Sequence, residues 1–321
     1  MKLMRTLSTV LLALLTAFAG SAQGQAWPSR PIRIVVPFAP GGAQDLDARG
    51  LAAFMEPHLK NAVVVENRPG AGAAIGIEAV AKAAPDGHTL LVTGASITQL
   101  NFLRKGLTFD ATKELVPISQ LSEGITTIVT NRQSPFKTWQ EMVAYAKANP
   151  GKLNFGGIGV SSVHIAWQSL IRTIGIDIPE IPYAGQSAYE TALLRNDVQV
   201  ILGLNFKPRV DSGDIVPLIA IGDKRHPHFP NVPTTNDLGY GKAIRGFGWT
   251  GFFAPAGTPK PIVDRLAFEA ANYAKDPDAV RRITAAGSVL VGSSPQEFKK
   301  SFDNDTQVWG AVAKAINLQP Q

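Results

Sequence analysis

The chain has 321 residues, of which 45% are hydrophobic and only 17% charged, a composition that supports buried cores and excludes an intrinsically disordered protein. The absence of cysteine from the sequence excludes disulfide frameworks, thiolate nucleophiles and cysteine-ligated zinc or iron–sulfur centres. A formal charge of +6 raises nucleic acid as a partner, but lysine and arginine form no dense run interleaved with aromatic residues. We therefore expect no nucleic-acid binding.

The first 26 residues have the pattern of a secretory signal peptide. Lys2 and Arg5 precede an apolar run at 7–19, and small and polar residues follow up to Ala26. The run is shorter than the roughly 20 residues that span a bilayer. We expect export with cleavage after Ala26, or, as second choice, after Ala22. Loss of the two cations lowers the formal charge to +4.

From residue 31 onward, apolar β-branched runs alternate with glycine turns and amphipathic stretches. The pattern predicts strands at 32–38, 62–66 and 88–93 and helices at 46–58 and 75–84. This βαβαβ order predicts a mostly parallel sheet.

The second part of the chain repeats this order of elements. It predicts strands at 125–130, 153–155, 198–202, 217–221 and 249–254. Serine or threonine followed three residues later by glutamate indicates the start of a helix at Thr138, at Ser187 and at Ser294. Further helices are expected after Ser161 or Ser162 and near Pro259.

The candidate catalytic and cofactor motifs are incomplete. Ser161 and Ser162 lie close to His164, but no G-x-S-x-G elbow surrounds them, so we expect no enzyme and keep an exported serine hydrolase using Ser162 and His164 only as an alternative. The spacing at 70–76 misses the dinucleotide fingerprint. His226 and His228 are expected in an exposed loop, not at a metal. We expect neither metal nor cofactor.

Two glycine-rich loops, at 38–43 and 155–162, each join a predicted strand to a predicted helix. Glycine allows a ligand to approach backbone amides at the positive end of a helix dipole, and neither loop contains lysine or arginine. The loops predict a small carboxylate held by amides, hydroxyls and bridging waters; alternatively, the glycines only make tight turns. Asp45 either complements the helix dipole or accepts a hydrogen bond from a water or from a ligand amino group, and Asp47 is expected on the solvated surface.

Several motifs carry a resemblance to a known family. They are PIRIVVPFAPGGAQD at 31–45, VVENRPGAG at 64–72, AKAAPDGHTLL at 81–91, YAKANPGKLN at 145–154, PY at 182–183, NVPT at 231–234 and FAPAGTP at 253–259. From about Trp27 to the C-terminus the chain resembles the Bug family, the extracytoplasmic solute receptors of tripartite tricarboxylate transporters.

The resemblance implies an α/β fold of the type II periplasmic-binding-protein class, with two lobes around a ligand cleft. Residues 27–124 and 252–321 would form lobe 1 and residues 125–251 lobe 2, with crossings near Ile125 and Gly251. It implies a periplasmic monomer that captures a small mono-, di- or tricarboxylate, carboxylated amino acid or aromatic acid and delivers it to two integral-membrane permease subunits. A sensor that docks onto a membrane kinase is the alternative.

The family pattern also implies which residues bind the ligand. Lobe 1 would supply Phe38, Ala39, Pro40, Gly41, Gly42, Ala43, Asp45, Thr93, Ser96 and Thr98. Lobe 2 would supply Gly156, Gly157, Gly159, Ser161, Ser162, His164, Tyr183, Gly185, Gln186 and Asn205. The loop at 157–160 and the stretch at 201–205 depart from the family pattern, and these departures predict a less acidic, more apolar distal pocket.

Overall fold

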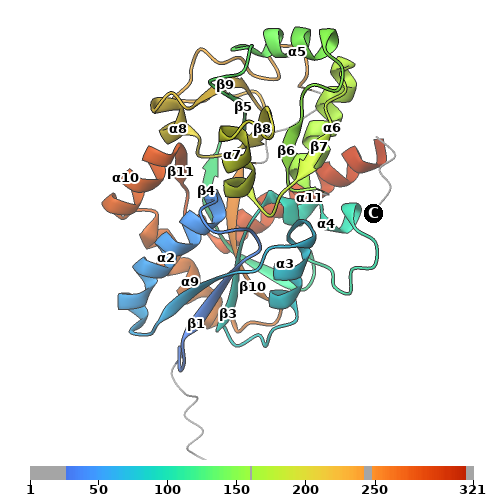
Figure 1. The fold of residues 1–321 in the computed structure, drawn as a ribbon. Coiled ribbons are helices and arrows are strands. Elements are labelled where there is room, and N and C mark those ends of the chain that lie inside the picture. The colour runs from blue at the N-terminus through green and yellow to red at the C-terminus, as the bar shows by residue number, and fades with distance from the viewer. Residues whose placement is uncertain (1–26, 160, 242–247, 316–321) are drawn as a thin grey trace, which may run out of the picture.

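The computed structural model describes residues 27–159, 161–241 and 248–315, and the predicted signal peptide lies outside these ranges. The described chain forms two α/β lobes, each built around its own sheet (Figure 1). The strand order is β11-β4-β10-β3-β1-β2 in the first lobe and β7-β6-β8-β5-β9 in the second. Within the described ranges, no helix combines the length and the apolar character that a membrane crossing requires.

The first lobe contains the predicted βαβαβ unit, in which β1 pairs in parallel with both β2 and β3. The sheet as a whole is mixed, because β10 runs antiparallel between β3 and β4. The elements of this lobe are β1 (Ile32–Val36), α2 (Ala43–Leu59), β2 (Val63–Asn67), η1 (Ala71–Ala73), α3 (Ala74–Ala81), β3 (Thr89–Gly94), η2 (Ala95–Thr98), α4 (Leu100–Leu103), β4 (Leu115–Gly124), β10 (Trp249–Pro255), α9 (Lys260–Tyr273), α10 (Pro277–Ala286), β11 (Ser288–Leu290) and α11 (Pro295–Ala315).

The second lobe has the same construction on a smaller scale. Strand β6 pairs in parallel with β7 and β8, and β5 runs antiparallel between β8 and β9. Its elements are β5 (Thr127–Asn131), α5 (Trp139–Ala148), β6 (Phe155–Gly157), α6 (Ser162–Ile174), β7 (Glu180–Pro182), α7 (Gln186–Leu194), β8 (Val200–Gly203), α8 (Lys207–Asp211) and β9 (Ile215–Ala220).

The chain passes between the sheets at two places. It leaves the first sheet at Gly124, the end of β4, and enters the second at Thr127, the start of β5. The chain has returned to the first sheet by Trp249, which pairs with Glu123 and lies two residues before Gly251. Residues 242–247, which precede this return, lie outside the described ranges.

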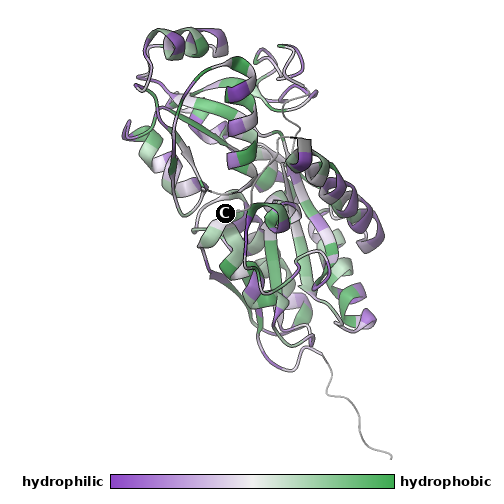
Figure 2. Ribbon diagram, turned by 90° about the vertical axis from the view of Figure 1, so that its right-hand side faces the viewer, coloured by the Kyte–Doolittle hydropathy of each residue, from purple (hydrophilic) through white to green (hydrophobic). Residues whose placement is uncertain are grey.

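Apolar packing explains why each sheet is covered by helices. In β1, four of the five side chains are fully buried: Ile32, Ile34, Val35 and Val36. Helix α11 returns across the first lobe, and its Phe298 packs edge-on against Trp249 of β10, with ring centroids 5.3 Å apart. Figure 2 shows the hydrophobic strands inside each lobe and hydrophilic helix surfaces outside.

Two of the three predicted capping boxes are confirmed and one is wrong. Thr138 with Glu141 caps α5, and Ser294 with Glu297 caps α11. Helix α7 instead begins after Gly185, which has no side chain to cap it. The Ser187 hydroxyl is consequently free to bond outside its own helix.

Two polar residues expected at the surface are buried. Asp47 is 2% exposed, because it occupies the stripe of α2 that faces β4, where the Ser122 hydroxyl donates a 2.6 Å hydrogen bond to it. His226 is also 2% exposed and stacks on Phe229 with ring centroids 4.2 Å apart. Burial first, and the neighbouring His228 second, lower the pKa of His226 to about 4, so this imidazole is neutral at ordinary pH.

Candidate functional site

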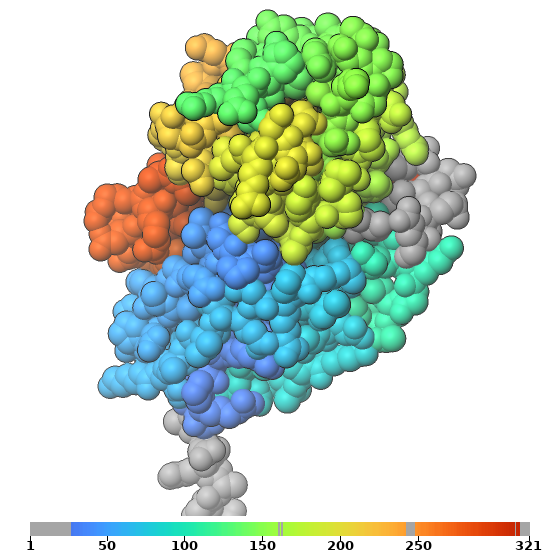
Figure 3. All heavy atoms as spheres, in the orientation of Figure 1, coloured from blue at the N-terminus to red at the C-terminus, as the bar shows by residue number. Residues whose placement is uncertain are grey.

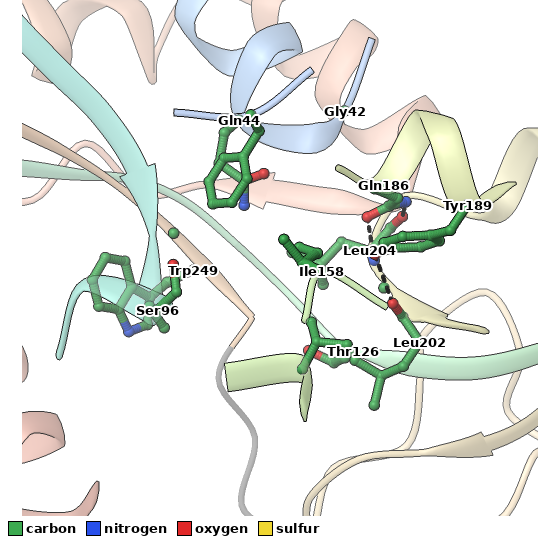
Figure 4. A pocket seen from close by; sticks show the side chains of 15 residues that line it. Gly42, Gln44, Ser96, Thr126, Ile158, Gln186, Tyr189, Leu202, Leu204 and Trp249 are labelled. Carbon is green, nitrogen blue, oxygen red and sulfur yellow. Dashed lines mark hydrogen bonds between the residues drawn. The ribbon is translucent and has the colours of Figure 1, made fainter. Parts of the chain in front are cut away.

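A cavity of about 60 Å³ lies where the two lobes meet. The first lobe contributes Phe38, Gly42, Gln44, Gly94, Ala95, Ser96 and Trp249, the crossing contributes Thr126, and the second lobe contributes Ile158, Val163, Gln186, Tyr189, Leu202, Gly203 and Leu204. None of these residues carries a charge. Figure 4 shows Gln44 over the cavity, with Ser96 and Trp249 facing Gln186, Tyr189 and Leu204 across it.

The first wall is the amino end of α2 together with the loop that follows β1. Gly41 has φ +84, a left-handed conformation that glycine adopts without strain, and Gly42 is the extended N-cap. No side chain caps this helix, so amides of its first turn have no partner from a capping side chain. Since Gly42 and Gln44 line the cavity, the positive end of a 17-residue helix lies beside it.

Asp45 holds this loop in shape and does not line the cavity. Its Oδ2 accepts hydrogen bonds from the Gly41 amide at 2.8 Å and Arg49 Nε at 2.9 Å, and its Oδ1 accepts one from Asn67 Nδ2 at 2.9 Å. Burial alone would raise the pKa of this carboxyl, but hydrogen bonds from Arg49, Gly41 and Asn67, together with the Arg49 charge, lower it. The carboxylate is therefore ionised and already satisfied within the first lobe.

Two hydroxyls in the cavity wall have no hydrogen-bond partner among the residues that the structure describes. Ser96, in η2, is 7% exposed, and Thr126, between β4 and β5, is 2% exposed. The neighbouring Thr98 hydroxyl is satisfied because it donates to the Ala95 carbonyl at 2.8 Å, whereas Thr93 is fully buried in β3 with its hydroxyl unpartnered. Buried hydroxyls are seldom left unpaired, so those of Ser96 and Thr126 are available to a polar ligand or to a bound water.

The second glycine loop is tied to a carboxylate of its own lobe. Glu180 Oε1 accepts the Gly159 amide at 2.9 Å, and Oε2 lies 2.6 Å from His164 Nδ1. Gly157 leaves room for this arrangement, since a Cβ there would stand 2.1 Å from Glu180 Oε1. The Ser161 hydroxyl accepts a hydrogen bond from the His164 amide as the N-cap of α6.

This arrangement bears on the hydrolase alternative. The His164 ring pairs with Glu180 and the Ser161 oxygen caps its own helix, so neither makes the hydrogen bond of a serine–histidine dyad. The Ser162 side chain lies outside the described part of the structure. Among the described residues, no group of three histidine, aspartate or glutamate side chains could hold a metal ion.

The polar groups of the second wall are paired within the second lobe. The Gln186 amide bonds to both backbone groups of Leu204, its Nε2 donating to the carbonyl and its Oε1 accepting the amide at 3.2 Å. The Tyr189 hydroxyl donates to the Leu202 carbonyl at 2.8 Å. The remaining surface of this wall is aliphatic, with Ile158 and Val163 facing the cavity.

The lobes also contact each other directly beside the cavity. The Ser187 hydroxyl donates a 2.7 Å hydrogen bond to the Pro40 carbonyl, and the Ala39 amide donates a 3.4 Å bond to the Ala184 carbonyl. In Figure 3 the yellow surface of the second lobe rests on the blue surface of the first. The structure thus describes a closed arrangement.

The structure brings together some of the predicted site residues and separates others. Phe38, Gly42, Ser96 and Gln186 line the cavity. Ala39, Pro40 and Gly185 lie at the contact between lobes, whereas Ala43 is buried in α2. Gly156 packs against Tyr189 in the second core, the Tyr183 amide bonds to the Gly157 carbonyl, and Asn205 accepts a 2.5 Å bond from Ser288.

The sequence reasoning missed several lining residues. Gln44 stands two residues after the N-cap glycine, which is the signal that could have found it. Thr126 and Trp249 lie at the two crossings, where a cleft between lobes must be lined by the connecting chain. Ile158 belongs to the loop at 157–160, whose departure from the family pattern predicts a more apolar distal pocket, and Val163 follows this loop in α6; both line the cavity.

A family model and several solved structures place the chain among the same group of proteins. Residues 48–318 match the protein family described as "Tripartite tricarboxylate transporter family receptor". The periplasmic binding protein BugD has a similar structure, with a TM-score of 0.87 and 30% identity, over 92% of this chain and 100% of that one. MatC from Rhodopseudomonas palustris, solved with bound malate, gives a TM-score of 0.82 and 28% identity over 89% and 100% of the two chains. A second R. palustris protein, solved with adipate, gives 0.84 and 26% over 92% and 100%.

Proposed function

Because the chain belongs to the family of tripartite tricarboxylate transporter receptors, of the Bug type, we propose that it captures a small carboxylate in the cavity between its lobes. The observation that carries this proposal is the combination, in one uncharged cavity, of an uncapped helix amino end and two unpartnered buried hydroxyls. Malate and adipate, the ligands in two similar structures, are both carboxylates.

The physical argument favours an anion over a neutral or cationic ligand. Backbone amides at a helix amino end donate hydrogen bonds and carry a partial positive charge, which stabilises an anion without a lysine or arginine. Asp45 accepts the Gly41 amide, which precedes the helix, and the Arg49 charge pairs with its carboxylate. Ser96 and Thr126 then supply further donors to the same end of the ligand, directly or through bridging waters.

The wider role follows from the family. The protein would work in the periplasm as a monomer and deliver the bound acid to two integral-membrane permease subunits. Recovery of the permease subunits with the liganded protein from solubilised membranes supports delivery. Recovery of a membrane kinase in their place contradicts it and favours a sensor.

Isothermal titration calorimetry of the purified protein tests carboxylate binding, with linear, branched and aromatic acids of three to seven carbons as ligands. Each acid is compared with its amide, which keeps the shape and removes the charge. We expect saturable binding of at least one acid and none of its amide. Absence of binding across the acids, or equal binding of acid and amide, contradicts the proposal.

A further inference from the structure

A second and larger cavity lies where the two lobes are joined. It has a volume of about 450 Å³ and is called the back groove below. Glu123, Val289 and Asp305 line it from the first lobe, and Ile221, Asp223 and Lys224 line it from the second. The two lobes therefore face each other across the back groove as well as across the ligand cavity.

The back groove and the ligand cavity lie on opposite faces of the first sheet. The cavity is lined by Gln44 of α2, whereas the groove is lined by residues of α11. A Cβ at Gly94, the sheet partner of Thr250, would meet Gln44. A Cβ at Gly251, the next residue of β10, would instead meet Phe298 of α11. Because successive side chains of a strand point to opposite faces, α2 and α11 cover opposite faces of the sheet.

The two crossings separate the ligand cavity from the back groove. Thr126 and Trp249 line both spaces, and Gly124 and Gly248 line the groove. The Gly124 amide donates a 2.6 Å hydrogen bond to the Gly248 carbonyl, so the crossings are joined to each other. A rotation of one lobe against the other about the joined crossings therefore widens one of the two spaces and narrows the other.

Contacts between the lobes differ on the two sides of the crossings. On the cavity side, the hydrogen bond from Ser187 to the Pro40 carbonyl brings the lobes into contact. Across the back groove, no hydrogen bond or ion pair joins the two walls within the part of the chain that the structure describes. The nearby bond from Ser288 to Asn205 lies at the crossing itself, because Ser288 pairs with Gly124 in the sheet. Further closure is thus limited by contact, whereas opening has the space of the groove available.

We propose that the back groove is the space into which the lobes rotate when the ligand cavity opens, so that bulk placed in this groove holds the protein closed and tightens ligand binding. The affinity part of this inference rests on the proposed function, because it concerns the regulation of the same site. A group that fills the groove needs no contact with the ligand, since it raises the free energy of the open state alone.

A filled groove changes both the affinity and the rates of binding. The apparent affinity for a ligand held by both lobes falls with the fraction of unliganded protein that is open, so a smaller open fraction tightens binding. A ligand enters and leaves through the open state, so its association and its dissociation both become slower. Because the affinity rises, dissociation must slow by the larger factor.

Single cysteines allow the groove to be filled in steps, because the sequence contains no other cysteine. Val289→Cys places a thiol on the first-lobe wall at a position that is 54% exposed, and methyl or benzyl methanethiosulfonate then adds a small or a large group to it. Val291→Cys, two residues farther from the crossing and outside the groove, is the matched control. Reduction removes each group, so the same folded protein serves as its own reference.

Small-angle scattering of the unliganded protein, and calorimetry with malate and adipate as probes, measure the effect. We expect benzyl-labelled Val289→Cys to have a smaller radius of gyration than its reduced form and to bind the acids about three- to tenfold more tightly, with the methyl group in between. Unchanged scattering, unchanged or weaker binding, or equal shifts in labelled Val291→Cys overturn the inference and leave the proposed function standing. If neither acid binds the reduced protein, the scattering alone decides the inference, and the wider set of acids decides the proposed function.

Discussion

At the scale of residues, neighbouring side chains differ in whether their hydrogen-bonding groups are available to a ligand. Thr126 has a buried hydroxyl without a partner, while the adjacent Thr127 hydroxyl donates to the Ile125 carbonyl at 3.2 Å. These neighbours differ in function because one lines the cavity and the other belongs to the packed start of β5. We therefore expect the Thr126 hydroxyl to contribute to ligand binding and the Thr127 hydroxyl to contribute to folding stability.

We predict that Thr126→Val lowers the affinity for the bound carboxylate about three- to tenfold, the loss of one hydrogen bond. The thermal midpoint of the unliganded protein should stay the same or rise, because a buried unpaired hydroxyl is removed. Thr127→Val should do the reverse, lowering the midpoint and sparing affinity. Calorimetric titration and thermal unfolding of both variants check this, and a Thr126→Val protein of undiminished affinity contradicts the assignment.

At this scale the sequence predicts the first wall better than the second. The glycines at 41–42 directly precede a helix, so local spacing is enough to place backbone amides at a ligand. The glycines at 157–159 look equivalent, yet Glu180, 21 residues beyond Gly159, takes up one of their amides. A hydrogen-bond partner that comes from another strand cannot be predicted from the residue spacing within the loop.

At the scale of elements, helix α2 begins at the glycine loop beside the cavity and packs against β4, the strand that leads to the first crossing. Its buried stripe follows a spacing of four residues, through Ala43, Asp47, Leu51, Met55 and Leu59. The same spacing in the sequence could have placed Asp47 inside, but an aspartate on an apolar face is uncommon. Its partner strand β4 also went unpredicted, because the buried Ser119 and Ser122 and Pro117 interrupt the apolar pattern of a strand.

Asp47 gives the protein a pH-dependent stability. Burial raises its pKa from 3.8 to about 6, despite the hydrogen bond from Ser122. The folded state therefore binds the proton more tightly than the unfolded state, so this residue lowers stability progressively as pH rises from about 4 to about 6. Two pKa units correspond to about 3 kcal/mol.

We predict that Asp47→Asn removes the loss of stability that accompanies ionisation of Asp47. The difference in unfolding free energy between Asp47→Asn and the unaltered protein should increase by up to about 3 kcal/mol between pH 4 and pH 7. Asp45→Asn is the comparison of opposite sign, because the lowered pKa of Asp45 makes its carboxylate stabilising at neutral pH. Urea unfolding across this range measures both differences, and a pH-independent difference for Asp47→Asn refutes the prediction.

At the scale of the whole molecule, the lobes are held together partly by their own atoms. The hydrogen bond from Ser187 to the Pro40 carbonyl joins α7 to the loop before α2, so separation of the lobes would break it. Any contact made only in the closed state raises the population of that state and hence the apparent affinity for a ligand held by both lobes.

Ser187→Ala should therefore weaken ligand binding although Ser187 does not line the cavity. The expected loss is about two- to tenfold, and small-angle scattering should show a larger unliganded radius of gyration that contracts when ligand is added. Ser212→Ala, whose hydroxyl bonds only within the second lobe, is the control. Unchanged affinity in Ser187→Ala, or scattering that does not respond to ligand, argues against closure of this kind.

The position of β10 also fixes the order in which the protein can acquire its structure during synthesis. Residues 249–255 lie between β3 and β4, so the first sheet lacks its connecting strand until about four-fifths of the chain has been translated. The second sheet uses only residues 127–220 and is complete earlier. All strands of the second sheet are therefore available before the first sheet receives its central strand β10.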